Sequence, residues 1–156
     1  MKTELILVGK TVNKHLAACS ADYMERIGHY LPFSVTTIPE LKNTKSLSEQ
    51  QQKEREGEQI LHLVMPSDTV VLLDEHGTTM RSVEFAAWLQ KKQLTARRLV
   101  FVIGGPYGFS EAVYRRANEQ LSLSPMTFSH QMVRLIFTEQ LYRACTIVKG
   151  EPYHHE

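Results

Sequence analysis

Residues 104–108, Gly104-Gly105-Pro106-Tyr107-Gly108, are the strongest local signal for a binding site in this chain of 156 residues. Three glycines in five residues, directly after the apolar run 99–103, permit positive φ angles and close approach of the backbone to a ligand. The segment holds no Lys or Arg, which disfavours phosphate and favours a neutral ligand held by backbone groups. A tight strand-to-helix turn without a ligand would explain the same residues equally well.

A second candidate loop covers residues 123–128, with the sequence LSPMTF. It mixes apolar side chains with free backbone groups, a combination that suits a purine ring. The alternative is that Leu123, Met126 and Phe128 belong to the core or to an interface between chains.

Basic residues are concentrated in the last third of the chain. Residues 97–149 contain seven Lys or Arg and only three acidic residues, although the whole chain has a net charge of +1. This asymmetry indicates a phosphate-rich partner such as RNA. Solvated helix faces are the alternative, with Glu139 and Arg143 paired at i, i+4.

The tail 151–156, EPYHHE, is unusually aromatic and rich in histidine for a chain end. Tyr153 and His154 are of the types that stack on a base and move protons. A docked tail that only seals an interface is the alternative.

Several common chemistries are excluded because their motifs are absent. The sequence has no GxGxxG, GxxxxGK[ST], HExxH or GxSxG pattern, and the adjacent His154 and His155 make a poor chelate, so we expect no metal. Cys19 and Cys145 are far apart and predict reduced, buried thiols in a cytoplasmic protein. No apolar run approaches the length of a membrane helix, and none resembles a secretion signal.

Strand and helix patterns alternate along the chain. Apolar or β-branched runs predict strands over residues 4–8, 34–38, 69–73, 99–103 and 120–123. Amphipathic spacing predicts five helices, over residues 13–30, 46–64, 83–94, 111–118 and 130–148. The expected N-caps are Asn13 for the first, Ser82 for the third and Ser110 for the fourth; the second begins with a capping box at 46–49, and the last starts from Ser129.

This alternation predicts an α/β fold, in which a mostly parallel sheet carries helices on both faces, in a single domain over 1–156. The fully apolar runs 69–73 and 99–103 indicate burial on both sides of the sheet. In such sheets ligands bind beyond the carboxyl ends of the strands. The loops expected there are 74–77, 104–109 and 124–129.

Five segments together resemble the SPOUT superfamily of knotted methyltransferases: LILVGK (5–10), VLLDEHG (71–77), LVFVIGGPYGF (99–109), LSLSPMTFSHQMVRLIFTEQLYRA (121–144) and PYHHE (152–156). The nearest resemblance is to small bacterial members that methylate N3 of a pseudouridine in 23S ribosomal RNA. It implies a C-terminal trefoil knot, a homodimer, S-adenosylmethionine as methyl donor without a metal, and action on the assembled ribosome, with no role for membrane or DNA.

The resemblance also implies site residues. The cofactor pocket would be lined by Leu73, Gly104, Leu123, Ser124, Pro125, Met126, Thr127 and Phe128. Candidates for the catalytic groups that accept or ease release of the N3 proton are His130, Tyr153 and His154. Arg134, Arg143 and His155 would contact RNA. His155 stands where the family has Arg or Lys, so it would carry a positive charge only when protonated. The apolar helix 130–148 suits a dimer interface.

Two alternatives remain at this point. One is a SPOUT enzyme with another RNA target such as transfer RNA, and the other is a non-catalytic module that binds the ribosome.

Overall fold

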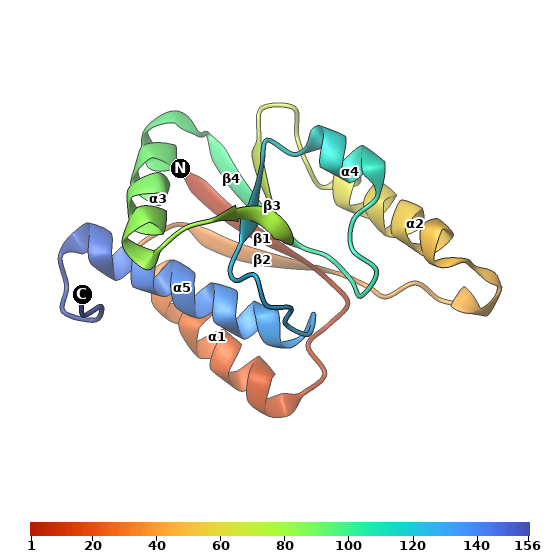
Figure 1. Cartoon of the computed structure of the whole chain (residues 1–156), viewed down its shortest axis with the longest axis horizontal. Coiled ribbons are helices and arrows are strands. Elements are labelled where there is room, and N and C mark those ends of the chain that lie inside the picture. Colours follow the sequence, from red (N-terminus) through yellow and green to blue (C-terminus); the bar gives the residue numbers. More distant parts are fainter.

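A five-stranded parallel sheet forms the centre of the molecule in the computed structural model, which describes all residues 1–156 (Figure 1). The strands are β1 (Lys2–Val8), β2 (Phe33–Ile38), β3 (Thr69–Thr79), β4 (Arg98–Ile103) and β5 (Glu119–Ser122). Their order is β2-β1-β4-β3-β5, and every neighbouring pair is parallel. The predicted α/β class with a parallel sheet is confirmed.

Helices cover both faces of this sheet, as predicted (Figure 1). They are α1 (Lys14–Gly28), α2 (Glu49–His62), α3 (Ser82–Thr95), α4 (Glu111–Arg116) and α5 (Met132–Lys149), with a short 3-10 turn η1 at Thr44–Ser46. Helices α1, α3 and α5 pack on one face, and α2 and α4 pack on the other. No helix combines the length and the hydrophobicity needed to cross a bilayer.

Strand β4 shows why the central strands are apolar at every position. Its residues Leu99, Phe101 and Ile103 point into the core under α1, α3 and α5, whereas Val100 and Val102 point into the core under α2 and α4. All five are at most 2% exposed. The predicted burial on both faces is therefore confirmed.

Two helix starts follow the sequence prediction. The Asn13 carboxamide oxygen accepts the backbone N–H groups of His15 and Leu16 at 2.9 and 3.1 Å. The Ser110 hydroxyl accepts the N–H of Val113 at 3.4 Å. Both side chains satisfy donors that the first helical turn leaves without an intrahelical partner.

The capping box before α2 lies two residues later than predicted. Ser46 belongs to η1, and Ser48 is the N-cap. The Ser48 hydroxyl accepts the N–H of Gln51 at 3.1 Å, and the Gln51 side chain accepts the N–H of Ser48 at 2.9 Å. The prediction failed because both serines stand three residues before a side chain that can complete a box.

Two other helix starts also differ from the prediction. Helix α3 includes Ser82, and the preceding Arg81 is its N-cap, whose backbone N–H donates to the Glu84 side chain at 2.8 Å. Helix α5 begins at Met132, although the Ser129 hydroxyl still accepts the Met132 N–H at 3.0 Å.

Strand β3 continues through residues 74–77, which were predicted to form a loop. Its pairing with β5 shifts between Leu73 and Thr78, since both lie opposite Leu121. A Cβ atom at Gly77 would lie 2.6 Å from the carbonyl carbon of Gln120, so only glycine fits this close approach. The resulting bulge gives residues 74–76 room to project beyond the sheet.

The two thiols differ in their surroundings. Cys145 is buried as predicted, but Cys19 is exposed, so the prediction of two buried thiols is wrong for Cys19. Burial raises the pKa of the Cys145 thiol to about 12.

Candidate functional site

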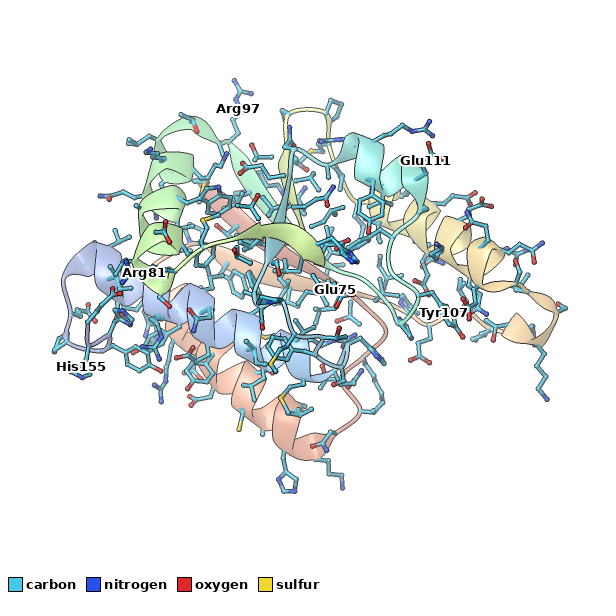
Figure 2. The ribbon with its side chains drawn as sticks, in the orientation of Figure 1. Glu75, Arg81, Arg97, Tyr107, Glu111 and His155 are labelled. Atoms are coloured by element: carbon cyan, nitrogen blue, oxygen red, sulfur yellow. The ribbon has the colours of Figure 1, made fainter.

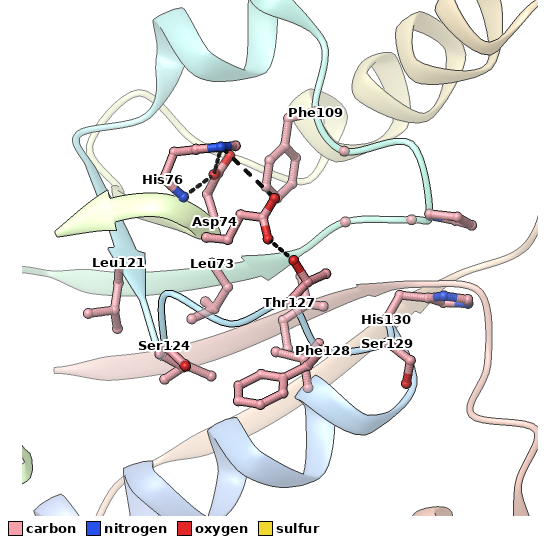
Figure 3. A pocket seen from close by; sticks show the side chains of 18 of the residues that line it. Leu73, Asp74, His76, Phe109, Leu121, Ser124, Thr127, Phe128, Ser129 and His130 are labelled. Carbon is pink, nitrogen blue, oxygen red and sulfur yellow. Dashed lines mark hydrogen bonds and ion pairs between the residues drawn. The ribbon is translucent and has the colours of Figure 1, made fainter. Parts of the chain in front are cut away.

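A cleft of about 520 Å³ lies at the carboxyl ends of β3, β4 and β5 (Figure 3). Its walls come from residues at 73–76, 103–109 and 121–130, with Tyr114 and Val133. The structure thus brings together the three loops that the parallel-sheet rule selected. The volume lies within the range of about 300–1,000 Å³ that is typical of small-molecule sites.

Two of the glycines after β4, Gly104 and Gly108, are favoured by the packing and backbone of the loop, and Gly105 lies against a Glu56 carboxylate that can move. A Cβ atom on Gly104 would lie 2.9 Å from the ring of Phe109, and one on Gly105 would lie 2.8 Å from a carboxylate oxygen of Glu56. Gly108 has a φ angle of +83°, which L side chains rarely adopt. The Phe109 ring therefore keeps the loop free of a side chain at Gly104, where it borders the cleft.

The loop after β5 contributes most of the predicted cofactor residues. The members that line the cleft are Leu123, Ser124, Met126, Thr127 and Phe128; Pro125 is not among them. Met126 is 77% exposed, an unusual position for a large apolar side chain unless a ligand or partner covers it. The Ser124 hydroxyl accepts the N–H of Met126 at 3.0 Å, which shapes the turn.

The charge of the cleft comes from two carboxylates, Asp74 and Glu75, and no Lys or Arg lines it. Asp74 accepts hydrogen bonds from the Tyr114 hydroxyl and from the N–H of His76, and Glu75 accepts one from the Thr127 hydroxyl (Figure 3). Burial and the bond to Asp74 raise the pKa of Tyr114, so its hydroxyl remains a donor. This arrangement favours a cationic or neutral ligand over a phosphate.

His130 is the one predicted catalytic residue that lines the cleft. It is half-buried in the turn before α5, and no protein group hydrogen-bonds to its ring, whereas its backbone carbonyl accepts from Arg134 Nε at 3.1 Å. The imidazole is therefore available to a ligand or substrate.

Tyr153, His154, His155 and Arg143 lie at the other end of α5. The helix has 18 residues, so at 1.5 Å per residue its ends are about 27 Å apart. Figure 2 shows His155 near Arg81 at one end of the molecule and Tyr107 of the glycine loop toward the other. Within one chain, the structure therefore does not bring these residues to His130.

The tail residues form a compact polar cluster on α5. The Arg143 guanidinium donates to Glu139 at 2.5 Å and to His154 Nδ1 at 3.0 Å, and its carbon lies 4.8 Å from the centre of the Tyr153 ring. Because a guanidinium only donates, His154 accepts at Nδ1. The Arg143 Nε group is buried without a partner.

Tyr153 is held as a hydrogen-bond donor in this cluster. Its hydroxyl donates to Glu139 at 3.0 Å. Burial is the main cause that raises the pKa of Tyr153, and hydrogen bonds with Tyr23 and Glu139 add to it. A phenol with a raised pKa is a poor proton acceptor at neutral pH, so this geometry favours a donor role.

Arg134 is buried completely, contrary to what contact with RNA in this arrangement would require. Its guanidinium donates to the carbonyls of Val8 at 2.7 Å and Gly9 at 2.8 Å and to the Thr11 hydroxyl at 3.1 Å. Burial lowers the pKa of Arg134. The placement favours a structural role, in which Arg134 fastens the β1–α1 loop to the start of α5.

Sequence reasoning gave no chemical role to Asp74, Glu75 or Tyr114. The two acidic residues were visible as part of the loop expected at 74–77, but Tyr114 lies on α4 and carries no local signal that it reaches the cleft. The structure places no three metal-ligating side chains together.

Comparison with known proteins decides the family of this chain. Residues 1–154 match the family described as "Predicted SPOUT methyltransferase". The chain belongs to the SPOUT methyltransferase family. Proteins named "Ribosomal RNA large subunit methyltransferase H" are similar to it over the full length of both chains, with 61% identity for Bacteroides fragilis, 60% for Bacteroides thetaiotaomicron and 55% for Porphyromonas gingivalis.

A solved structure supports the fold at lower similarity. It is described as a "probable methylase family protein" from Haemophilus influenzae Rd KW20 and is 14% identical. The match has a TM-score of 0.55 and covers 99% of this chain and 70% of the other.

Proposed function

We propose that this protein is an S-adenosylmethionine-dependent methyltransferase that methylates N3 of a pseudouridine in 23S ribosomal RNA within the assembled ribosome. The observation that carries the proposal is the cleft at the carboxyl ends of β3, β4 and β5, whose glycine loop and apolar rim belong to a chain of the SPOUT family. The names of the full-length relatives support ribosomal RNA as the substrate class.

The residues of the cleft fit the proposed donor. Exposed backbone at Gly104 and in the loop 123–128 can hydrogen-bond to a purine, and Leu73, Met126 and Phe128 offer apolar contact to its faces. Asp74 and Glu75 suit a ligand with a positive centre. When bound there, S-adenosylmethionine supplies a methyl group already activated on a sulfonium, so the protein mainly has to position the nucleotide in line with it.

The remaining chemical task is removal of the proton from N3 of the pseudouridine. His130 lines the cleft and its ring has no hydrogen-bond partner within the chain, which makes it the best-placed proton acceptor of the three candidates. Tyr153 would donate a hydrogen bond to a carbonyl oxygen of the base once its hydroxyl leaves Glu139, at the position where negative charge grows as the N3 proton departs.

A homodimer would bring the tail residues Tyr153, His154 and His155 of one copy to His130 in the cleft of the other. If α5 helices of two copies pair in opposite directions across a twofold axis, the tail of one copy reaches the cleft of the other. Apolar side chains are available for such an interface. Val12, in the loop between β1 and α1, is 69% exposed, and Met132, at the start of α5, is 39% exposed. In this arrangement Arg143 and His155 face the RNA bound at the partner's cleft. The C-terminal trefoil knot is part of the same proposal.

The direct test combines binding and product analysis. Calorimetry measures binding of S-adenosylmethionine, and ribosomes lacking the modification are incubated with labelled donor and digested for nucleoside mass spectrometry. We expect a 3-methylpseudouridine from 23S RNA. A methylated transfer RNA nucleoside would redirect the proposal to another RNA, and absence of donor binding would leave a non-catalytic ribosome-binding module.

The composite site has its own test, based on mixing two inactive variants. His130→Ala and His154→Ala are each expected to lose most single-turnover activity. Refolding equal amounts together should restore about a quarter of the wild-type sites, because half of the dimers are mixed and each holds one intact site. If each site were built within one chain, mixing would restore nothing.

A further inference from the structure

Three exposed lysines lie on the loops that follow β1 and β2: Lys10, Lys42 and Lys45. We call them the lysine patch. Because all strands are parallel, these loops leave the sheet at the same edge as the loops of the cleft (Figure 1). None of the three lysines is within ion-pair distance of a carboxylate of the chain.

The lysine patch adjoins the cleft through specific contacts. The carbonyl of Lys10 accepts a hydrogen bond from the Gln131 side chain at 3.4 Å, and the neighbouring His130 lines the cleft. The loop after β2 lies against the same segment, since a Cβ atom on Gly9 would be 2.8 Å from Cγ of Glu40. Lys10 therefore lies beside the cleft, and Lys42 and Lys45 follow on the loop that starts against the same segment.

Most basic residues counted in the stretch 97–149 are already engaged within the chain. Arg98 pairs with Asp68 at 2.7 Å, and Arg143 pairs with Glu139 at 2.5 Å. Arg116 donates to the carbonyl groups of Met65 and Asp68, and Arg134 is buried. The charge asymmetry of the sequence therefore does not identify the surface that meets an anion.

Two acidic residues lie next to this part of the surface. A Cβ atom on Gly9 would be 2.8 Å from Cγ of Glu40, and one on Gly105 would be 2.8 Å from a carboxylate oxygen of Glu56. Neither carboxylate is within ion-pair distance of Lys10, Lys42 or Lys45, so the charge of the lysine patch remains available to an external anion.

We propose that the lysine patch binds the RNA phosphates that flank the target nucleotide. The inference rests on the proposed function, because a base that enters the cleft brings its sugar–phosphate backbone to the rim. The cleft carries two carboxylates and no Lys or Arg, so it repels phosphate, and the backbone must run beside it. The loops after β1 and β2 offer unpaired cations on that side.

The test is the triple variant Lys10→Gln/Lys42→Gln/Lys45→Gln, assayed with large ribosomal subunits that lack the methyl group. We expect KM for the subunits to rise about tenfold and the slope of log KM against log salt to fall by about 2, since each lost phosphate contact removes somewhat less than one released ion. The Kd for S-adenosylmethionine, measured by calorimetry, should not change and reports correct folding.

A control with the same loss of charge is Lys2→Gln/Lys91→Gln/Arg97→Gln. These three side chains are exposed and unpaired, and they lie at the amino end of β1, near the end of α3 and just before β4, at the opposite edge of the sheet. We expect KM and the salt slope of this variant to stay within about twofold of wild type, because its charges are more than a Debye length of about 10 Å from the cleft.

Three outcomes would overturn the inference. In the first, the lysine-patch variant keeps the wild-type KM and salt slope. In the second, the control variant changes as much as the lysine-patch variant, which would indicate a general effect of net charge. In the third, KM rises with an unchanged salt slope, which would show that the lysines do not act by neutralising phosphates. A wild-type protein that neither binds the donor nor methylates would instead refute the proposed function.

Discussion

Replacing Glu75 by Gln removes one of the two carboxylates of the cleft and keeps an oxygen that can accept the hydrogen bond of Thr127. A cleft of about 520 Å³ is about 10 Å across, so a ligand charge inside it interacts with Glu75 by about 0.4–1.7 kcal/mol, for effective dielectric constants of about 80 to 20. The Glu75 side chain is 41% exposed, so solvent screens this interaction, and we expect its energy to be about 0.4–1 kcal/mol.

The expected result is a selective loss of affinity. S-adenosylmethionine carries a net charge of +1 because of its sulfonium, and its Kd should rise about two- to fivefold in Glu75→Gln. S-adenosylhomocysteine has an uncharged sulfur and no net charge, so its Kd should stay nearly constant. Calorimetry at two salt concentrations measures both ligands, and the difference should shrink at high salt.

Thr127→Val is the matched control, since it removes the hydrogen bond and leaves the carboxylate in place. A looser loop should weaken both ligands by the same factor. If Glu75→Gln also weakens both ligands equally, or if the difference between them does not depend on salt, the electrostatic reasoning for the cleft is wrong.

Three further predictions follow from the packing. Gly104→Ala should lower the affinity for S-adenosylmethionine about tenfold or more in calorimetry, because the new methyl group meets the Phe109 ring. Gly28→Ala is the control: its methyl group has open space, so the free energy of unfolding in urea should change by less than about 1 kcal/mol. Arg134→Met should lower the free energy of unfolding by about 3 kcal/mol, because it leaves buried carbonyl groups unpaired, and a loss below about 1 kcal/mol in urea denaturation would contradict this. Because the pKa of Cys145 is raised in the folded protein, the unfolded chain releases the thiol proton at a lower pH than the folded one. The free energy of unfolding, measured with urea, should therefore fall as pH rises from about 9 to about 12. A free energy that stays constant or rises over this range would contradict the raised pKa of Cys145.

Much of the sheet could be predicted because its signal is local. Strands β3 and β4 contain the runs TVVLL and LVFVI, and such runs are stable only when both faces are covered. Parallel pairing then requires all carboxyl ends to lie at one edge, which is why the loops after β3, β4 and β5 could be selected before the fold was known. Asn13 and Ser110 were found as caps because a cap acts only on its own first turn.

The composition of the site depended on contacts that local patterns do not encode. At the bulge in β3 both Leu73 and Thr78 pair with Leu121, and the residues between them place Asp74 and Glu75 in the cleft. Arg134 looked like a free cation, but it satisfies carbonyl groups more than a hundred residues away in sequence. Periodicity reports how much of a side chain is buried, not which distant segment buries it.

The sequence by itself determined the class of the fold, the edge of the sheet that holds the site and the family of the chain. Only the tertiary structure decided which candidates share that site: His130 lines the cleft, whereas Tyr153 and His154 lie a helix length away. The physical reason is that hydrophobic patterning sets each element, while the distance between side chains on different elements is set by how those elements pack.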